Sequence, residues 1–386
     1  MSSKYSRFLT ALFCLFIGGM FLVSTILPDR EMSETENRYL QQAPTLSLGN
    51  ITNGTFMSQA EDYTADQIVG RDFWVALKAW CERMSGKQEN NGVYFGKEDT
   101  LLNRVSEPSW EDTPARGDTP FQAGLSTRLD YVDALVGNVS VPVYFGLIPS
   151  SSTVWADRLP AGAPTADELS WIEQMYFATG ASTIDLAGAL LAHKGEDIYY
   201  RTDHHWTSLG AFYGANAIFE ALGLEPLDLS DYDKTTVTDQ FYGTIYSTSG
   251  VRWVRPDSID TYIPADGVHV TSWFGAQPSE GSLYVDQYLS VKDKYSYFLG
   301  GQQQPLCVIE SDKAPDGPKV LVLRDSYSDS LAPFLTERFS EVHLFDPRNN
   351  LTSVKDYLAQ NDIDSVIVLY SFQNFATDQN LFVLGR

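Results

Sequence analysis

Short apolar runs alternate with longer amphipathic segments along the C-terminal two thirds of the chain. Continuous apolar runs are typical of strands buried on both faces, as in a parallel sheet covered by helices. We therefore predict an α/β domain over residues 125–386. The expected strands are 141–148, 182–186, 319–324, 341–346 and 363–370, and the expected helices are 127–137, 165–180, 331–339 and 351–360.

Two stretches interrupt this alternation. Residues 227–316 are rich in Tyr, Thr, Ser and Gly, which predicts a β-rich insertion that covers one edge of a functional site. Residues 103–124 contain three prolines and many turn formers, which predicts a linker and a domain boundary. Before that boundary, residues 28–124 are expected to form a polar stalk, a membrane-proximal helical region and the linker itself.

Residues 8–27, FLTALFCLFIGGMFLVSTIL, carry no charge over twenty positions. About 20 apolar residues suffice to span a bilayer as a helix. Lys4 and Arg7 precede the segment and acidic residues follow it, so we expect residues 1–7 to form a cytoplasmic tip. A cleaved signal peptide is the alternative, although the run is long and no Ala-x-Ala site follows it. Both interpretations place the bulk of the chain outside the cytoplasm, at the cell surface or in the periplasm.

The charge balance limits the partners. The chain has 50 acidic and 27 basic residues, for a formal net charge of −23. A field of this sign repels phosphate backbones and anionic lipid headgroups. We therefore expect no nucleic-acid partner, and any attachment to a membrane must be hydrophobic.

A serine stands where the strand predicted at 319–324 gives way to a helix, in the sequence DSYSDS. Ligands of open α/β sheets bind outside the carboxyl ends of the strands, and N–H groups at a helix start point toward ligand oxygens. Ser326 is thus placed like an acyl-transfer nucleophile, although the motif differs from the Gly-x-Ser-x-Gly elbow. The simpler interpretation is that Asp325, Ser326 and Ser328 only cap the helix.

A second group of reactive side chains lies in the sequence TDHHWT, residues 202–207. In an extended segment, residues i and i+2 share a face, so Asp203 and His205 are expected to point one way and His204 the other. A carboxylate beside an imidazole fixes the tautomer and stabilises the imidazolium of a Ser-His-Asp triad. The spacing therefore selects His205 as the general base.

Two metal-based interpretations compete with the triad. A zinc site needs three or four ligands, and the other histidines show no ligand spacing. A phosphoesterase with an Asp-His-His metal motif would need further aspartate motifs upstream and a cytoplasmic setting, and the sequence indicates neither. We therefore expect no metal site and no cofactor.

Four motifs in order along the chain resemble the DHHW family of bacterial surface proteins. They are SETENRYL (33–40), TDHHWT (202–207), KDKYSYFLGG (292–301) and VLRDSYSDSLAPF (322–334). The resemblance covers most of the chain after the apolar segment. That family is similar to the SGNH-like domains of the alginate O-acetylation enzymes, which use a Ser-His-Asp triad with the Asp-x-His element before the serine.

The resemblance assigns roles to individual residues. Ser326 matches the nucleophile, and Asp203 and His205 match the Asp-x-His element. This order is the reverse of that in ordinary SGNH hydrolases, which implies a permuted version of the SGNH fold. The candidates for oxyanion or substrate contacts are Asn374, Arg324, Trp206 and Tyr327.

The implied function is a membrane-anchored O-acetyltransferase or acetylesterase that acts on a cell-surface polysaccharide through a serine acyl-enzyme. By analogy with the family, a membrane-bound O-acyltransferase partner would supply the acyl group. The alternative from another class is a catalytically silent carbohydrate-binding surface protein that stacks sugars on its tyrosines and tryptophans.

Overall fold

The computed structural model describes residues 3–116, 120–274, 277–301 and 304–386, in two compact units. The smaller unit comprises Met1–Asn91 and Tyr246–Trp253, and the larger comprises Gly92–Ile245 and Val254–Arg386. The predicted tip and linker include residues 1–2 and 117–119, which lie outside the described residues. The domain division predicted from the sequence stays a prediction.

The smaller unit begins with α1 (Ser3–Ile26), the apolar segment predicted above. Within the described residues, α1 is the helix whose length and composition suit a membrane span, and a signal sequence has the same properties. The other elements of this unit are β1 (Met32–Ser33), β2 (Arg38–Tyr39), α2 (Leu48–Thr52), α3 (Thr55–Asp66), α4 (Arg71–Met84) and β3 (Glu89–Asn90).

Within the segment predicted to be a polar stalk, the chain folds back on itself, because β1 and β2 pair as a short antiparallel hairpin. Ion pairs at Asp66, the last residue of α3, join α3 to the hairpin through Arg38 and to α4 through Arg71. The Arg38 guanidinium donates to Asp66 Oδ2 at 2.9 Å, and Arg71 Nε lies 3.3 Å from Asp66 Oδ1. The hydrogen bond from Arg38 lowers the pKa of Asp66 to about 2, against the effect of burial. The motif SETENRYL therefore contributes structure to this unit.

The larger unit contains an eight-stranded sheet in the order β11-β10-β12-β14-β13-β15-β6-β7. Five neighbouring strands, β14 to β7, are parallel, and β12, β10 and β11 extend them in antiparallel fashion. The strands are β6 (Val143–Ile148), β7 (Ser182–Ile184), β10 (Val268–Trp273), β11 (Pro278–Glu280), β12 (Leu306–Ser311), β13 (Lys319–Arg324), β14 (Glu341–Phe345) and β15 (Ser365–Ser371).

The α/β class is thus confirmed, and the predicted parallel sheet is present as five of the eight strands. Strands from the predicted insertion join the sheet at its β14 edge, which makes it mixed. The insertion also contains a separate antiparallel pair, β8 (Thr235–Phe241) and β9 (Asp257–Thr261), and α10 (Thr244–Ser249) between them. The remaining elements are β4 (Val93–Phe95), β5 (Leu101–Asn103), α6 (Ser151–Val154) and 3-10 turns at Ala156–Arg158, Leu229–Asp231, Asp286–Ser290, Lys294–Tyr297 and Leu381–Gly385.

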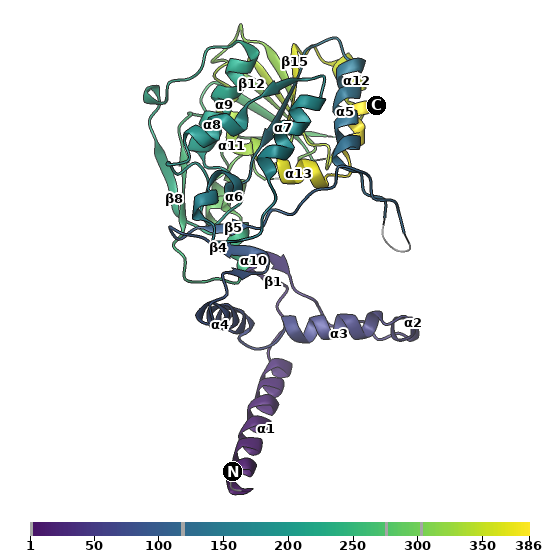
Figure 1. The fold of residues 1–386 in the computed structure, drawn as a ribbon, viewed down its shortest axis with the longest axis vertical. Coiled ribbons are helices and arrows are strands. Elements are labelled where there is room, and N and C mark those ends of the chain that lie inside the picture. Colours follow the sequence, from purple (N-terminus) through teal and green to yellow (C-terminus); the bar gives the residue numbers. More distant parts are fainter. Residues whose placement is uncertain (1–2, 117–119, 275–276, 302–303) are drawn as a thin grey trace. The chain divides into compact units, whose positions relative to one another are not determined.

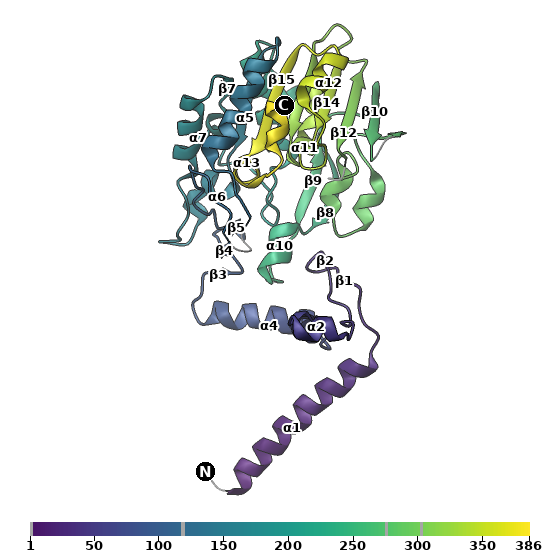
Figure 2. The same ribbon diagram turned by 90° about the vertical axis from the view of Figure 1, so that its right-hand side faces the viewer.

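Helices cover both faces of the sheet (Figures 1 and 2). Because side chains alternate along a strand, Val320 and Val322 of β13 enter one core and Leu321 and Leu323 enter the other. The first core is closed by α8 (Leu186–Ala192), α9 (Ser208–Leu222) and α11 (Ser328–Leu335). The second is closed by α5 (Leu125–Asn138), α7 (Glu168–Ala178), α12 (Val354–Gln360) and α13 (Phe372–Thr377).

The parallel strands bring three loops to one edge. In the register of the sheet, Leu323 of β13 lies beside Phe345 of β14 and Val368 of β15. Parallel neighbours end at the same edge, about 4.8 Å apart. The residues that follow β13, β14 and β15 therefore meet where an open α/β sheet binds its ligands.

Candidate active site

Ser326 lies in the tight turn between β13 and α11 and is almost fully buried, with 1% of its surface exposed. Its hydroxyl does not cap the helix. The capping position of α11 is Tyr327, which makes no side-chain capping bond. Instead, Ser326 Oγ lies 2.8 Å from Nε2 of His205. The turn thus presents the hydroxyl to an imidazole that comes from a segment 121 residues earlier.

His205 lies in a loop closed by a β-bridge between Tyr199 and Trp206 and by a hydrogen bond from the Tyr200 N–H to the His205 carbonyl. Its Nδ1 lies 2.6 Å from Oδ1 of Asp203, and its backbone N–H donates to the same oxygen at 3.0 Å. A carboxylate at Nδ1 favours the tautomer with its proton on Nδ1. That tautomer leaves Nε2 free to accept the Ser326 proton.

Asp203 is saturated with hydrogen bonds. Its second oxygen, Oδ2, accepts from the Thr244 N–H at 2.7 Å and from the Thr244 hydroxyl at 2.9 Å. Burial works to raise the pKa of Asp203, but His204, His205 and these hydrogen bonds outweigh it and hold the pKa well below its ordinary value. Asp203 is therefore a fixed negative charge behind His205. Together Ser326, His205 and Asp203 have the geometry of a Ser-His-Asp triad.

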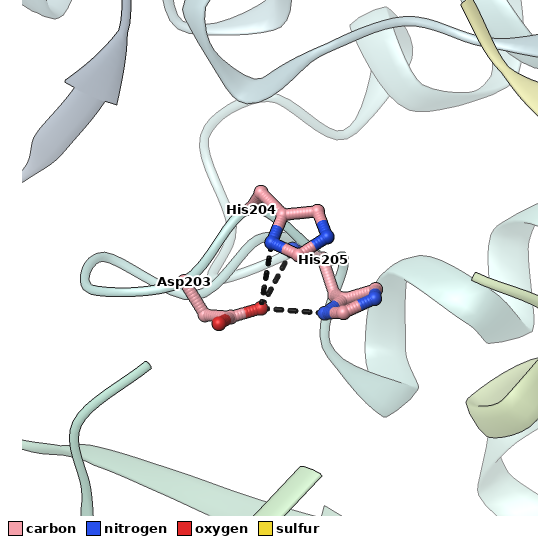
Figure 3. A group of neighbouring side chains, drawn as sticks. All are labelled: Asp203, His204 and His205. Carbon is pink, nitrogen blue, oxygen red and sulfur yellow. Dashed lines mark hydrogen bonds and ion pairs between the residues drawn. The ribbon is translucent and has the colours of Figure 1, made fainter. Parts of the chain in front are cut away.

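His204 does not point away from the pair, so the expectation from extended geometry is wrong. The segment is a series of bends, and the His204 ring centroid lies 3.8 Å from that of His205. Figure 3 shows both imidazoles turned toward Asp203, with His204 Nδ1 3.6 Å from Oδ1. The His204 side chain is 31% exposed and His205 only 1%, so His204 borders solvent. Burial and the neighbouring His205 lower the pKa of His204 to about 4, and the ring is neutral at pH 7.

These three residues are also the group in the described part of the chain whose ligand atoms could surround a metal ion, since the atoms lie within 4.8 Å of one another. Such an ion would compete with existing bonds. Asp203 Oδ1 already accepts from His205, and His204 Nδ1 lies 2.7 Å from the Thr244 hydroxyl. The donor set fits a hydrogen-bonded triad more directly than a metal centre.

Tyr295 is a site residue that our sequence reasoning did not assign, although it lies inside the motif KDKYSYFLGG. Its ring stacks on His205 with the centroids 3.7 Å apart and the planes 7° from parallel. Its hydroxyl donates to the Ser326 carbonyl at 3.0 Å and lies 3.1 Å from Ser330 Oγ. One side chain therefore fixes both the plane of the base and the turn that carries the serine.

The predicted substrate contacts are mostly buried. Trp206 is fully buried, and its indole N–H donates to the Tyr327 carbonyl at 2.9 Å, so the ring has no face open to a sugar. The Tyr327 hydroxyl donates to the His204 carbonyl. Arg324 is also fully buried and forms an ion pair with Asp329. Burial raises the pKa of Asp329 to about 6, although the ion pair with Arg324 lowers it. In this structure these side chains lie inside the protein and stabilise the turn between β13 and α11.

Asn374 reaches the site through Asp325. Its side-chain N–H donates to Asp325 Oδ2 at 2.7 Å, and Ser371 donates to the same oxygen through its backbone and its hydroxyl. The other Asp325 oxygen accepts from the Tyr327 N–H. Asp325 thus ties the end of β15 to the turn that carries Ser326, and it places the Asn374 amide beside that turn.

Arg348 is a second residue that sequence reasoning missed. It lies three residues beyond Phe345 of β14, as Ser326 lies three residues beyond Leu323 of β13, and those two strand residues are paired. Two hydrogen bonds to Asp346, at 2.9 and 2.7 Å, fix the guanidinium of Arg348, whose side chain as a whole is 26% exposed. It lies close enough to His204 and Asp325 to interact electrostatically with both. No local pattern marks this arginine, because only the register of the strands brings it near His204 and Asp325.

The comparison with protein families agrees with the motifs. Residues 173–345 match the model of the DHHW protein family, which confirms the resemblance predicted from the sequence. No curated protein matches the chain.

Solved structures share the fold. A DHHW family protein from Eubacterium siraeum aligns with a TM-score of 0.62 at 24% identity, over 77% of this chain and 95% of its own. Bacillus cereus PatB1, solved with a sulfonyl adduct, aligns with a TM-score of 0.60 at 20% identity, over 76% and 98%. The O-acetyltransferase domain of Pseudomonas putida AlgJ aligns at 14% identity over 74% and 92%, and its TM-score of 0.41 is too low to support an inference.

Proposed function

We propose that this chain is a membrane-anchored, extracytoplasmic acyl enzyme with a permuted SGNH-like fold, an O-acetyltransferase or acetylesterase that acts on a cell-surface glycan. The hydrogen-bonded line from Asp203 through His205 to Ser326 carries the proposal, with heavy-atom distances of 2.6 and 2.8 Å. Both distances are within the reach required of a nucleophile, its base and the group that orients the base.

In the first step Ser326 Oγ attacks the carbonyl carbon of an acetyl donor while His205 Nε2 takes the hydroxyl proton. Asp203 stabilises the resulting imidazolium through Nδ1. Collapse of the tetrahedral intermediate breaks the bond to the leaving group, which receives the proton from Nε2. The products are an acetyl-serine and the deacylated donor.

The second step repeats the chemistry with another nucleophile. A sugar hydroxyl, or water, attacks the acetyl-serine while His205 Nε2 accepts its proton, and that proton returns to Ser326 Oγ as the ester bond breaks. Transfer to a sugar yields an O-acetylated glycan, and transfer to water yields acetate. His204, neutral and partly exposed at the site, lies where an acceptor hydroxyl would approach.

The oxyanion is expected to bind the backbone N–H of Ser326, which makes no hydrogen bond within the described residues. This group stands just before the start of α11. The N–H groups of Tyr327 and Ser328 donate within the turn, to Asp325 Oδ1 and to the Asp325 carbonyl, so the oxyanion would rely on the Ser326 N–H and on a side-chain donor. The Asn374 amide has two N–H groups, and Asp325 accepts only one of them. We assign the second to the oxyanion or to the donor ester.

Anchorage and partners follow from the N-terminal helix. α1 would hold the catalytic unit at the outer surface of the membrane, and a membrane-bound O-acyltransferase partner would deliver the acetyl group. Arg348 uses Nε and Nη2 to bind Asp346, which leaves the Nη1 hydrogens and one Nη2 hydrogen for an acceptor that carries a carboxylate or phosphate.

The decisive experiment traps the acyl-enzyme. Incubation of the wild type with an acetyl ester such as 4-nitrophenyl acetate should add about 42 Da to the peptide that contains Ser326. Ser326→Ala should remove this adduct and lower turnover by about 10³-fold or more, as removal of a triad nucleophile does.

Ser328→Ala is the matched control, because Ser328 is equally buried and only two residues away. It should keep both the adduct and most of the turnover. Unchanged turnover in a folded Ser326→Ala variant would end the acyl-enzyme proposal. Glycan binding without any adduct in the wild type would then favour the silent carbohydrate-binding protein.

A further inference from the structure

Helix α4 carries an exposed apolar stripe. Phe73, Leu77, Trp80 and Met84 are exposed to 61, 36, 51 and 68%. Their spacing of four, three and four residues places them on one face of a helix. The buried residue of α4, Ala79, lies on a different face, so the stripe makes no contribution to the core of the unit.

The smaller unit is unusually rich in such side chains. Within the described residues, eleven large apolar side chains between positions 28 and 91 are exposed, and the whole larger unit exposes five. The eleven are Met32, Tyr39, Leu46, Leu48, Ile51, Met57, Ile68, Phe73, Leu77, Trp80 and Met84. Soluble surfaces rarely concentrate apolar groups in this way, and such patches indicate an interaction surface.

Helix α4 packs against the apolar helix α1 through a side chain outside the stripe. The Phe16 ring of α1 meets the Trp74 ring of α4 edge to face, with the centroids 6.1 Å apart. Ser24 of α1 accepts a hydrogen bond at 3.0 Å from the N–H of Val69, just before α4. Because α1 and α4 pack together, a bilayer that contains α1 also comes close to α4.

We propose that α4 is an interfacial helix that inserts its stripe of Phe73, Leu77, Trp80 and Met84 among the lipids beside α1. The inference rests on the proposed role of α1 as a membrane anchor. Helices of this kind place Phe, Trp and Leu in the boundary between headgroups and acyl chains, and tryptophan is enriched at that depth. The net charge of −23 gives anionic lipids no electrostatic attraction, so the attachment depends on apolar burial and suits a zwitterionic bilayer.

A spin-label experiment on the full chain tests the depth of the stripe. Of the three cysteines, Cys14 and Cys81 are exposed and Cys307 is buried, so a Cys14→Ser, Cys81→Ser background accepts one nitroxide at a chosen site. The label is placed through Leu77→Cys on the stripe or through the control Lys78→Cys, an exposed neighbour on another face. The proteins are reconstituted in phosphatidylcholine nanodiscs, and collision rates with oxygen and with a water-soluble nickel chelate are measured.

We expect a several-fold higher ratio of oxygen to nickel collisions for Leu77→Cys than for Lys78→Cys, because oxygen concentrates in lipid. Equal ratios, with the chain still retained in the discs, would overturn the interfacial helix and leave the anchor intact. A label at position 77 shielded from both reagents would overturn it in favour of a second copy or a partner protein on the stripe. Chains that leave the discs would overturn anchor and helix together. Acetyl-ester turnover, measured in parallel, reports separately on the proposed catalysis.

Discussion

Asp203→Asn is the substitution whose effect the site geometry specifies most closely. In the wild type, each carboxylate oxygen accepts two hydrogen bonds: Oδ1 from the N–H and Nδ1 of His205, and Oδ2 from the N–H and hydroxyl of Thr244. An amide has one acceptor oxygen, so its NH₂ group must face two donors. If the NH₂ group lies on the His205 side, Nδ1 can accept a hydrogen bond from it only when the ring proton moves to Nε2. Nε2 then cannot accept the Ser326 proton, so Ser326 has no base.

The opposite orientation of the amide keeps the tautomer but sets NH₂ against the Thr244 N–H and removes the negative charge that stabilises the imidazolium. Either arrangement leaves a buried donor unsatisfied, which costs about 1–3 kcal/mol of stability. The equivalent change in a serine protease triad lowers kcat by about 10⁴-fold, or about 5.5 kcal/mol of transition-state stabilisation. We expect a loss of that order here.

The assay is steady-state turnover of an acetyl ester, with a thermal unfolding scan of the same preparation. Glu168→Gln is the matched control, because Glu168 is also a buried carboxyl that accepts from the Ser150 N–H and hydroxyl, and it touches no triad residue. It should change stability and leave turnover within about twofold of the wild type, as substitutions outside the catalytic groups do. A folded Asp203→Asn protein that keeps more than about a tenth of wild-type kcat would refute the assignment of Asp203 as the orienting carboxylate.

Four further outcomes follow from the site and from the smaller unit. His204→Gln should retain turnover, and its melting temperature should fall less than that of the wild type between about pH 6.5 and pH 4. The reason is that the unfolded chain binds a proton in this range, whereas the His204 imidazole of the folded protein, with its pKa lowered to about 4, does not. Tyr295→Phe keeps the ring stacked on His205 but loses two hydrogen bonds. It should therefore cost about 1 kcal/mol of stability and preserve the pH profile of kcat. Tyr295→Leu removes the stacked ring and should change that profile. Arg348→Gln should raise KM for an acidic acceptor by about tenfold or more and leave acetyl-ester hydrolysis unchanged, and equal effects on acidic and neutral acceptors would contradict its proposed role. Asp66→Asn should lower the free energy of unfolding above about pH 4, and this loss should shrink as pH falls toward 2. Because the pKa of Asp66 is lowered in the folded protein, the stability that its ionised carboxylate contributes disappears over that range. A loss of stability that does not change with pH would contradict this.

The strands and helices around the nucleophile could be predicted because their signals are local. The strand expected at 319–324 is observed as β13 with the same bounds, and the helix expected at 127–137 is observed as α5, Leu125–Asn138. Both patterns arise from burial on known faces, which hydrophobic periodicity records directly. The β-rich insertion was predicted, but not that its strands join the main sheet. Antiparallel edge strands such as β11 (Pro278–Glu280) are short and exposed, and they carry no apolar run.

The orientation of His204 could not be derived from its spacing. Alternation along the chain holds only where the backbone is extended, and the loop between Tyr199 and Trp206 bends at every residue from 201 to 205. Asp203 and His205 nevertheless lie close together, as predicted, because two residues on either side of a bend can still share a hydrogen bond. Selection of His205 over His204 is now carried by the 2.8 Å contact to Ser326 rather than by alternation.

Asp325 shows why the remaining contacts of the site could not be predicted from the sequence. Read locally, it is a polar residue before a helix and thus a capping candidate. In the structure one oxygen accepts from the neighbouring Tyr327 N–H, as a cap would, but the other binds Ser371 and Asn374, which lie 46 and 49 residues further along the chain. Those bonds exist because β13 and β15 are parallel neighbours that end at the same edge. A residue whose local role is capping can therefore also hold the oxyanion candidate in place, and only the order and register of the strands reveal the second role.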